Sequence, residues 1–210
     1  MATELASNAL TTLEDMKTML GISPEDTTND EIIINLINGV SAWIERMTGR
    51  NLSKQTYTQW YNASGSQTLV LLQWPIVSID YIKEDKFEID PATYDYGQTG
   101  IIGVVYRDMG WPIRTYVGGL SYDMLAYRRL IEVRYTAGYV LPKDAKPPDE
   151  PCTLPYDLQK IVWDAVMQEF SIMQSGAMGL SAFSISDVSW TFDKSPRPEW
   201  LYTIGLYTRL

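Results

Sequence analysis

The sequence of 210 residues contains no histidine. Histidine is the commonest general base at neutral pH and the commonest metal ligand in proteins. It also activates the nucleophile in Ser–His and Cys–His sites, so that arrangement is excluded. Chemistry based on carboxylate, lysine or tyrosine side chains remains open. We expect a protein that is not an enzyme, with no catalytic residue, no metal site and no cofactor.

Cysteine is nearly absent, since Cys152 is the only one. An internal disulfide is therefore impossible, and without histidine nothing indicates an activated thiol. No run of about 18 apolar residues occurs that could form a transmembrane helix, so no membrane partner is expected. The residues around Glu4 also lack the basic and then apolar pattern of a signal peptide.

Positive charge is scarce, because 17 lysine and arginine residues stand against 26 aspartate and glutamate residues, a formal charge of −9. A protein that grips DNA usually carries a basic patch or stripe. The longest basic cluster here is Arg128-Arg129, so a DNA-binding regulator is disfavoured. As a hypothesis, the acidity suits a surface that DNA slides past.

Apolar residues recur at steps of three or four in three stretches, which predict helices over 10–20, 30–48 and 155–174. For the first helix, Thr11 and Glu14 have the spacing of a capping box. Gly21 and Gly49 stand where the first and second helices are expected to end.

The predicted helix over 155–174 carries two apolar stripes and leaves little solvated face. One stripe consists of Leu158, Ile161, Val162, Ala165 and Ile172. The other consists of Trp163, Val166, Met167, Phe170 and Met173. Such a helix is fully buried, or it packs on its own core with one side and on a neighbour with the other.

Between the second and third helices the period changes to alternation, which predicts a β-rich insertion over 55–139. We expect an antiparallel β-meander with a hairpin at Gly65 and with strands at 101–106 and 130–135. After Gly176 and Gly179, a single bulged strand from Phe183 to Phe192 and a last short helix are expected. The fold class is α+β: a helical bundle, an inserted β-meander and a C-terminal extension. The expected domains are a core over 1–175 and an extension over 176–210.

Acidic and aromatic clusters leave a carbohydrate-binding or carbohydrate-active module open as one alternative. The acidic residues are Glu84, Asp85, Glu88, Asp90, Asp187 and Asp193. The aromatic residues are Trp60, Tyr61, Trp74, Tyr81, Trp111 and Tyr116. Solvated carboxylates, and aromatics that fill a β-core or a subunit interface, explain the same residues.

Several short motifs follow one another in an order typical of one family. A first helix over 13–20 is followed by an acidic turn over 26–31 and by a long helix that ends in Met47-Thr48-Gly49-Arg50-Asn51-Leu52. Later motifs are Trp74-Pro75-Ile76-Val77-Ser78, Tyr135-Thr136-Ala137-Gly138-Tyr139, Leu154-Pro155-Tyr156-Asp157-Leu158 and Leu206-Tyr207-Thr208-Arg209. In this order they resemble the head–tail connector family of tailed bacteriophages, also called adaptor or head-completion proteins.

The resemblance implies a structural virion protein at the head–tail junction, the neck, that is assembled in the host cytoplasm. It implies a closed homo-oligomeric ring, generally a dodecamer, which docks under the portal protein, extends the DNA channel and seals the packaged genome. A tail-side neck or tail protein is the third partner, and DNA passes through without sequence-specific binding. Another phage role, a tail-completion or tail-terminator ring, stays open as an alternative.

The same resemblance assigns candidate surfaces to two apolar groups. For docking to the portal the candidates are Trp200, Leu201, Ile204 and Tyr207, although a helix packed on its own subunit would use the same residues. For the contact between ring subunits the candidates are Trp163, Val166, Met167, Phe170 and Met173.

Overall fold

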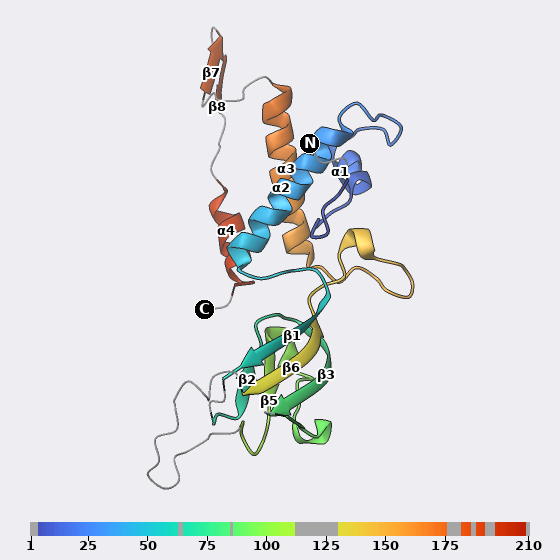
Figure 1. Cartoon of the computed structure of the whole chain (residues 1–210). Coiled ribbons are helices and arrows are strands. Elements are labelled where there is room, and N and C mark those ends of the chain that lie inside the picture. Colours follow the sequence, from blue (N-terminus) through green and yellow to red (C-terminus); the bar gives the residue numbers. More distant parts are fainter. Residues whose placement is uncertain are drawn as a thin grey trace. The chain divides into compact units, whose positions relative to one another are not determined.

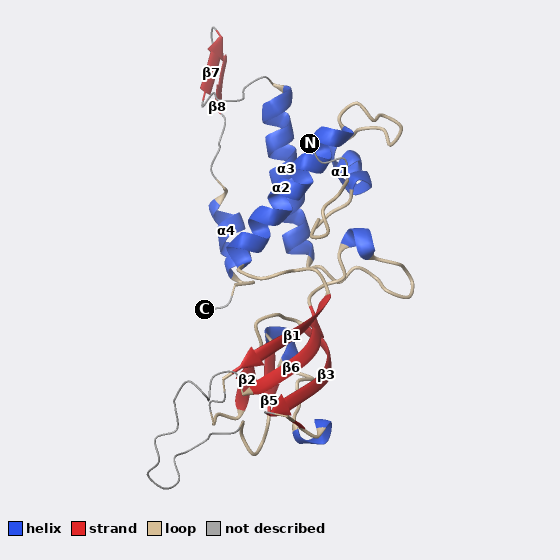
Figure 2. Cartoon of the chain, in the orientation of Figure 1, coloured by secondary structure: helices blue, strands red, loops and turns tan. Residues whose placement is uncertain are grey.

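The chain separates into a helical unit, Met1–Leu52 with Val140–Leu210, and a β-unit, Ser53–Tyr139. The structure, a computed structural model, describes residues 4–62, 65–84, 86–111, 130–175, 182–185, 188–191 and 196–208. Figure 2 shows the α-helices in the helical unit and the larger sheet in the β-unit, which confirms the expected α+β class. The expected joint at Gly176 and Gly179 lies outside the described residues, so the domain boundary at 175 stays a prediction.

The described residues of the helical unit form four α-helices: α1 (Leu13–Leu20), α2 (Asp30–Thr48), α3 (Tyr156–Gln174) and α4 (Pro198–Gly205). In Figure 1, α2 crosses α3, and α1 and α4 each contact both of these helices. A short 3-10 helix, η4 (Pro142–Asp144), precedes α3. The core between the helices includes Ile37 and Ile44 of α2 and Ile161 and Val162 of α3.

The first helix begins later than predicted, and a different threonine caps it. The side chain of Thr12 accepts a hydrogen bond from the amide of Asp15 at 3.0 Å. The expected capping residue Thr11 is instead buried, because its hydroxyl lies against α3. Gly21 ends the helix with φ 68°, where its amide donates to the carbonyl of Thr18.

One face of α2 holds the N-terminal segment through polar side chains. Asn38 Oδ1 accepts from the amide of Ala6 at 2.8 Å, and Ser41 Oγ accepts from the amide of Leu10 at 3.0 Å. One turn further on, Glu45 accepts from Asn8 Nδ2 at 2.6 Å and from the amide of Leu52 at 2.9 Å. Spacings of three and four residues place all three side chains on one stripe of the helix.

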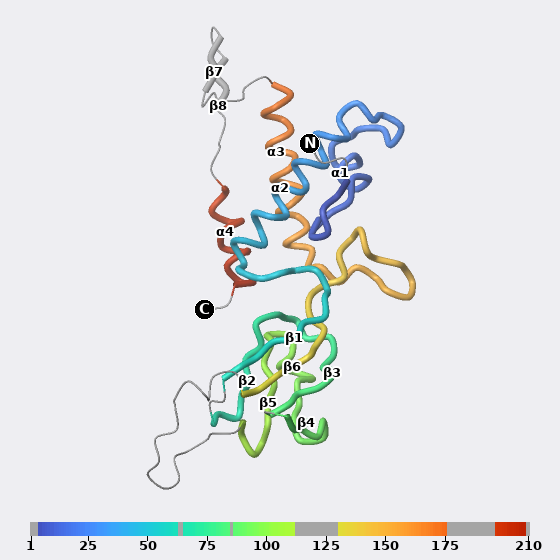
Figure 3. The backbone as a smooth tube through the Cα atoms, viewed as in Figure 1, coloured from blue at the N-terminus to red at the C-terminus, as the bar shows by residue number. Residues whose placement is uncertain are grey.

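The β-unit contains a four-stranded antiparallel sheet in the order β1-β6-β3-β4. Its strands are β1 (Gln55–Tyr61), β3 (Ile76–Glu84), β4 (Phe87–Glu88) and β6 (Ile131–Ala137). A separate ribbon pairs β2 (Thr68–Val70) with β5 (Val104–Tyr106). Two 3-10 helices, η1 (Pro91–Thr93) and η2 (Gly100–Ile102), lie in the connections. Figure 3 traces this path.

The expected meander is wrong, because β1 pairs with β6 rather than with β2. The reason lies in β6, whose alternate residues are buried, so that it forms a central strand with a neighbour on each side. Gly65 does have positive φ, 70°, yet the strands that flank it belong to different sheets. The expected strand at 101–106 is shorter, since Ile101 and Ile102 belong to η2 and are exposed.

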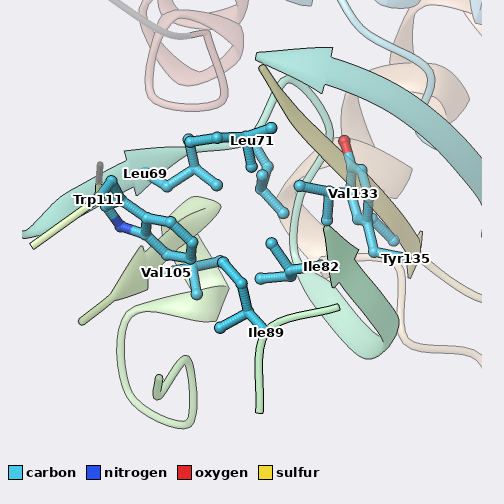
Figure 4. Close-up of a cluster of buried hydrophobic side chains, with 10 residues drawn as sticks. Leu69, Leu71, Ile82, Ile89, Val105, Trp111, Val133 and Tyr135 are labelled. Carbon is cyan, nitrogen blue, oxygen red and sulfur yellow. The ribbon is translucent and has the colours of Figure 1, made fainter. Parts of the chain in front are cut away.

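The ribbon packs on the inner face of the four-stranded sheet. Figure 4 shows Leu69, Leu71 and Val105 pointing toward Ile82 and Val133 of the sheet. The β-unit is therefore a two-layer sandwich, with one outer face on the sheet and the other on the ribbon.

The expected single bulged strand near the C-terminus is instead two antiparallel strands, β7 (Ala182–Ile185) and β8 (Val188–Thr191). Ile185 is paired with Val188, so the chain reverses at the expected break. Phe192 lies outside the described residues. The alternation of apolar residues is the same for one bulged strand as for two paired strands, so periodicity alone did not distinguish them.

Candidate assembly interface

The second apolar stripe of α3 lies largely inside its own unit. Val166 is fully buried and Phe170 is 8% exposed. Trp163, Met167 and Met173 are half-buried, so part of each side chain remains accessible. The five candidate ring residues therefore divide into two that pack inside the subunit and three that retain some accessible surface.

Trp163 links α3 to the segment before α1. Its indole Nε1 donates to Thr11 Oγ1 at 2.9 Å. The hydroxyl of Thr11 is buried with the residue, and a buried polar group is stabilised only when it has a hydrogen-bond partner. This contact holds one side of Trp163 within the subunit.

The four candidate docking residues of the C-terminal segment lie in different environments. Trp200 and Ile204 are buried at 6% and 1% exposure, where α4 packs on α2 and α3. Leu201 is 41% exposed at the border of this buried face. Leu201 is therefore the most accessible of the four residues, although more than half of its surface is covered.

Tyr207 fastens the end of the C-terminal segment to the helical unit. Its hydroxyl donates to both carboxylate oxygens of Asp157, at 2.8 and 2.9 Å, in the first turn of α3. Its carbonyl accepts from Arg50 Nε at 3.2 Å. Since Arg50 is buried and follows α2, the segment after α4 is bonded to the ends of two helices.

The outer face of α4 carries an apolar group that the sequence analysis only partly identified. We call Leu201, Tyr202 and Leu206 the outer α4 group; Tyr202 and Leu206 are 72% and 65% exposed. At about 100° per residue, Tyr202 and Leu206 point away from Trp200 and Ile204, and Leu201 lies at the border between the two faces. A helical-wheel plot of 198–206 would have found Tyr202 and Leu206, because it separates two apolar faces.

The candidate aromatic residues that the structure describes divide between the core and the outer face of the sheet. Trp111 is 2% exposed in the core, whereas Trp60 is exposed on the outer face of the sheet. Tyr81 donates from its hydroxyl to Glu132 Oε1 at 2.7 Å, and Lys83 Nζ lies 3.9 Å from its ring centroid. Tyr116 lies outside the described residues.

Among the candidate acidic residues that the structure describes, Asp90 has a structural role. Asp90 caps η1, because its side chain accepts from the amide of Ala92 at 2.9 Å. Glu88 lies opposite Lys83 in the β3–β4 pair. Asp85, Asp187 and Asp193 lie outside the described residues. Among the residues described, no group of three or more His, Cys, Asp or Glu side chains is placed to hold a metal ion.

Inside the sandwich, three polar side chains meet at one point. The hydroxyls of Tyr61 and Tyr135 both donate to Gln59 Oε1, at 2.7 and 2.6 Å. The same hydroxyls accept from the amides of Leu72 and Gln73, at 3.0 and 3.1 Å. Burial, and after it the hydrogen bond with Tyr61, raises the pKa of Tyr135 well above its ordinary value. We call Gln59, Tyr61 and Tyr135 the tyrosine hub; it stabilises the sandwich and offers no reactive group.

No helix in the described part of the chain is long and apolar enough to span a membrane. The accessible apolar residues of the helical unit include the outer α4 group, the half-buried residues of the second α3 stripe, and Met19, Met47 and Tyr156.

Comparison with known proteins agrees with this architecture. A solved structure described as the neck of an empty GTA particle, computed with C6 symmetry, contains a chain with a TM-score of 0.53 and 13% identity. The alignment covers 100% of this chain and 94% of that one, and at such identity it shows the fold alone. No curated protein matches. The model of the head completion protein family matches residues 9–147, which is more than half of the sequence, and the chain therefore belongs to the head completion protein family.

Proposed function

We propose that this chain is a non-enzymatic structural subunit of a ring in the neck of a phage particle. In this role the ring docks under the portal, extends the DNA channel and provides the attachment site for the tail. The observation that carries the proposal is the family match over residues 9–147, which includes α1, α2 and the whole β-unit. The absence of histidine and the capping and core roles of the described acidic and aromatic residues support a role without catalysis.

A ring of identical subunits is supported by symmetry. Identical subunits that contact each other head to tail form a closed ring when the rotation per subunit divides a full turn. The neck with the similar fold was computed with C6 symmetry, and a twelve-membered ring satisfies six-fold symmetry because twelve is a multiple of six. A dodecamer is therefore the ring size that we propose.

The surfaces proposed for the assembly are those that the helical unit leaves accessible. For the portal, the proposed surface is the outer α4 group, which includes Leu201 of the expected docking residues. Trp200 and Ile204 support it from behind by fixing α4 on the unit, and Tyr207 does so through Asp157. For the neighbouring subunit, the proposed helical contact uses the accessible parts of Met167 and Met173.

Electron microscopy of the purified full chain, alone and mixed with portal protein, tests the proposal. The expected result is a ring that is coaxial with the portal. Binding to the tail tube without binding to the portal would favour a tail-completion or tail-terminator ring. A monomer that binds neither partner contradicts both roles.

Substitution of the outer α4 group tests the docking surface without removing the helix. Truncation after residue 195 would also uncover the surfaces of α2 and α3 that Trp200 and Ile204 cover, so it would confuse folding with docking. The double variant Leu201→Ser/Leu206→Ser is expected to keep the thermal stability of the chain and to weaken portal binding at least about tenfold, as loss of buried apolar anchors does.

The control for this docking test is Met47→Ser, since Met47 is 44% exposed on α2, similar to Leu201. It removes a comparable apolar side chain from another surface and is expected to bind portal normally. Equal portal binding by the double variant and the wild-type chain, measured at equal folding, would remove α4 from the docking surface.

A further inference from the structure

The β2–β5 ribbon is apolar on both of its faces. Its inner residues Leu69 and Val105 belong to the sandwich core. On the outer face, Val70 lies opposite Val104 and Thr68 lies opposite Tyr106 in the antiparallel register. Directly paired residues of an antiparallel ribbon share a face, so Val70, Val104 and Tyr106 form one surface.

This outer surface extends beyond the two strands. The amide of Leu71 donates to the carbonyl of Gly103 at 2.8 Å, which continues the register by one pair. Leu72 follows this pair along the chain, and Ile102, the last residue of η2, directly precedes Gly103. Leu72 and Ile102 are 56% and 60% exposed. We call Val70, Leu72, Ile102, Val104 and Tyr106 the ribbon patch. It carries no charged residue, and contiguous apolar surface of this kind marks a contact site.

The opposite outer face of the sandwich belongs to the four-stranded sheet, and β1 forms its edge. Thr56, Thr58 and Trp60 of β1 are exposed, and Trp60 is 52% exposed. Over Gln55–Tyr61 the strand contains no charge and no proline, and its register with β6 is continuous, so it has no bulge. Charged residues, proline and bulges are means by which proteins protect a sheet edge, and β1 has none of the three.

The charges next to this strip are already paired within the sheet. Arg134 Nε lies 3.1 Å from Asp80 Oδ2, and Glu132 accepts from the hydroxyl of Tyr81. A partner that covers β1 therefore needs no opposite charge. An uncharged strip with an exposed tryptophan is complementary to an uncharged aliphatic patch, and tryptophan is enriched at the centres of interfaces.

We propose that the ribbon patch of one subunit packs against the β1 strip, Thr56, Thr58 and Trp60, of a second copy of this chain. The two surfaces lie on opposite outer faces of one sandwich, as a head-to-tail contact around a ring requires. The contact rests on the proposed ring function and assigns it a β-unit interface, in addition to the helices. Each subunit uses its ribbon patch toward one neighbour and its β1 strip toward the other.

Cysteine cross-linking of the assembled full chain tests this contact. In a Cys152→Ser background, the double variant Val70→Cys/Thr58→Cys is treated with a short bifunctional maleimide and separated by denaturing electrophoresis. Because the two positions lie on opposite faces of one subunit, a cross-link joins two subunits. We expect a ladder of covalent multimers from the double variant and only dimers from a one-to-one mixture of the single variants.

The matched control is Val70→Cys/Phe87→Cys, because Phe87 is 78% exposed in the β3–β4 pair, away from β1 in the sheet order. We expect no ladder from it. The proposal is overturned if the control gives a ladder in the same yield as Val70→Cys/Thr58→Cys. It is also overturned if Val70→Cys alone gives dimers in the same yield as the one-to-one mixture of the single variants. Rings without any Val70–Thr58 cross-link overturn this contact only, whereas a chain that never assembles overturns the ring function as well.

A charge substitution gives a second measurement. Val70→Asp is expected to raise the concentration for half-assembly at least about tenfold, because the carboxylate loses water when the patch is covered. Phe87→Asp is expected to leave that concentration unchanged. Equal assembly of Val70→Asp and the wild-type chain, with equal thermal unfolding, contradicts the contact.

Discussion

The tyrosine hub gives the sharpest test of how the β-unit is held together. Tyr135→Phe removes one hydroxyl and keeps the ring, which lies 5.8 Å from the ring of Tyr57. The hydroxyl donates to Gln59 at 2.6 Å and accepts from the amide of Gln73 at 3.1 Å. A hydrogen bond contributes about 0.5–1.5 kcal/mol net, and an amide left without its partner costs more. Since Tyr61 still satisfies Gln59, we expect the β-unit to lose about 2 kcal/mol.

Native-state hydrogen exchange of the β6 amides measures this loss within the β-unit itself. The slowest amides of a central strand report global opening, so a loss of about 2 kcal/mol accelerates their exchange about 30-fold. Tyr81→Phe is the control, because its hydroxyl bonds to Glu132 on the outer face, and it is expected to have a smaller effect. If the β6 amides of Tyr135→Phe exchange at the wild-type rate, the hub does not stabilise the sandwich.

Further outcomes are expected from the pKa of Tyr135, from two glycines and from Ser41. The raised pKa of Tyr135 means that the folded β-unit holds the phenol proton more tightly than the unfolded chain does. The stability that this proton contributes is complete below about pH 10 and is lost as the pH rises further. Alkaline unfolding, measured by circular dichroism, should therefore depend less on pH in Tyr135→Phe. Gly21→Ala should lower the free energy of unfolding by about 1 kcal/mol, since φ is 68°, whereas Gly39→Ala within α2, where a Cβ meets nothing within 4 Å, should raise it by about 0.5–1 kcal/mol, both in urea titrations. Ser41→Ala should cost about 1–2 kcal/mol in the same titration, because the amide of Leu10 loses its buried acceptor; an unchanged midpoint would mean that the N-terminal segment does not depend on α2.

Two patterns, one helical and one of a strand, were predictable because each has one dominant period. The helix expected over 30–48 is α2 with the same bounds, and the strand expected at 130–135 is β6 within two residues. In both cases the buried face follows the apolar period, and Gly49 ends α2 with φ 67°. The apolar period of the sequence was therefore sufficient to predict an element where one face of that element packs on the core.

Strand partners could not be predicted in the same way. The pairing of β1 with β6 joins Gln55 to Ala137, and nothing in the alternation of β1 prefers a partner that distant over the adjacent β2. The cap of α1 failed for a related reason: Thr11 and Thr12 both precede an acidic residue at the right spacing. Only the contact of Thr11 with Trp163, 152 positions away, decides between them. Long-range contacts therefore decide between strand partners, and between capping residues, that the local sequence pattern does not distinguish.

The candidate site shows the same division between pattern and packing. Periodicity identified α4 as amphipathic, yet it did not show that this helix has an apolar residue on each side. Ile204 is 1% exposed and Tyr202 is 72% exposed, so the two faces of this short helix have different environments. The inner residues pack within the subunit, whereas the outer α4 group remains accessible on this helix. Ile204 variants should therefore lose stability, whereas Leu201 and Leu206 variants should lose portal binding and keep their stability. A Leu201 variant that loses stability together with portal binding would place Leu201 in the core of the unit.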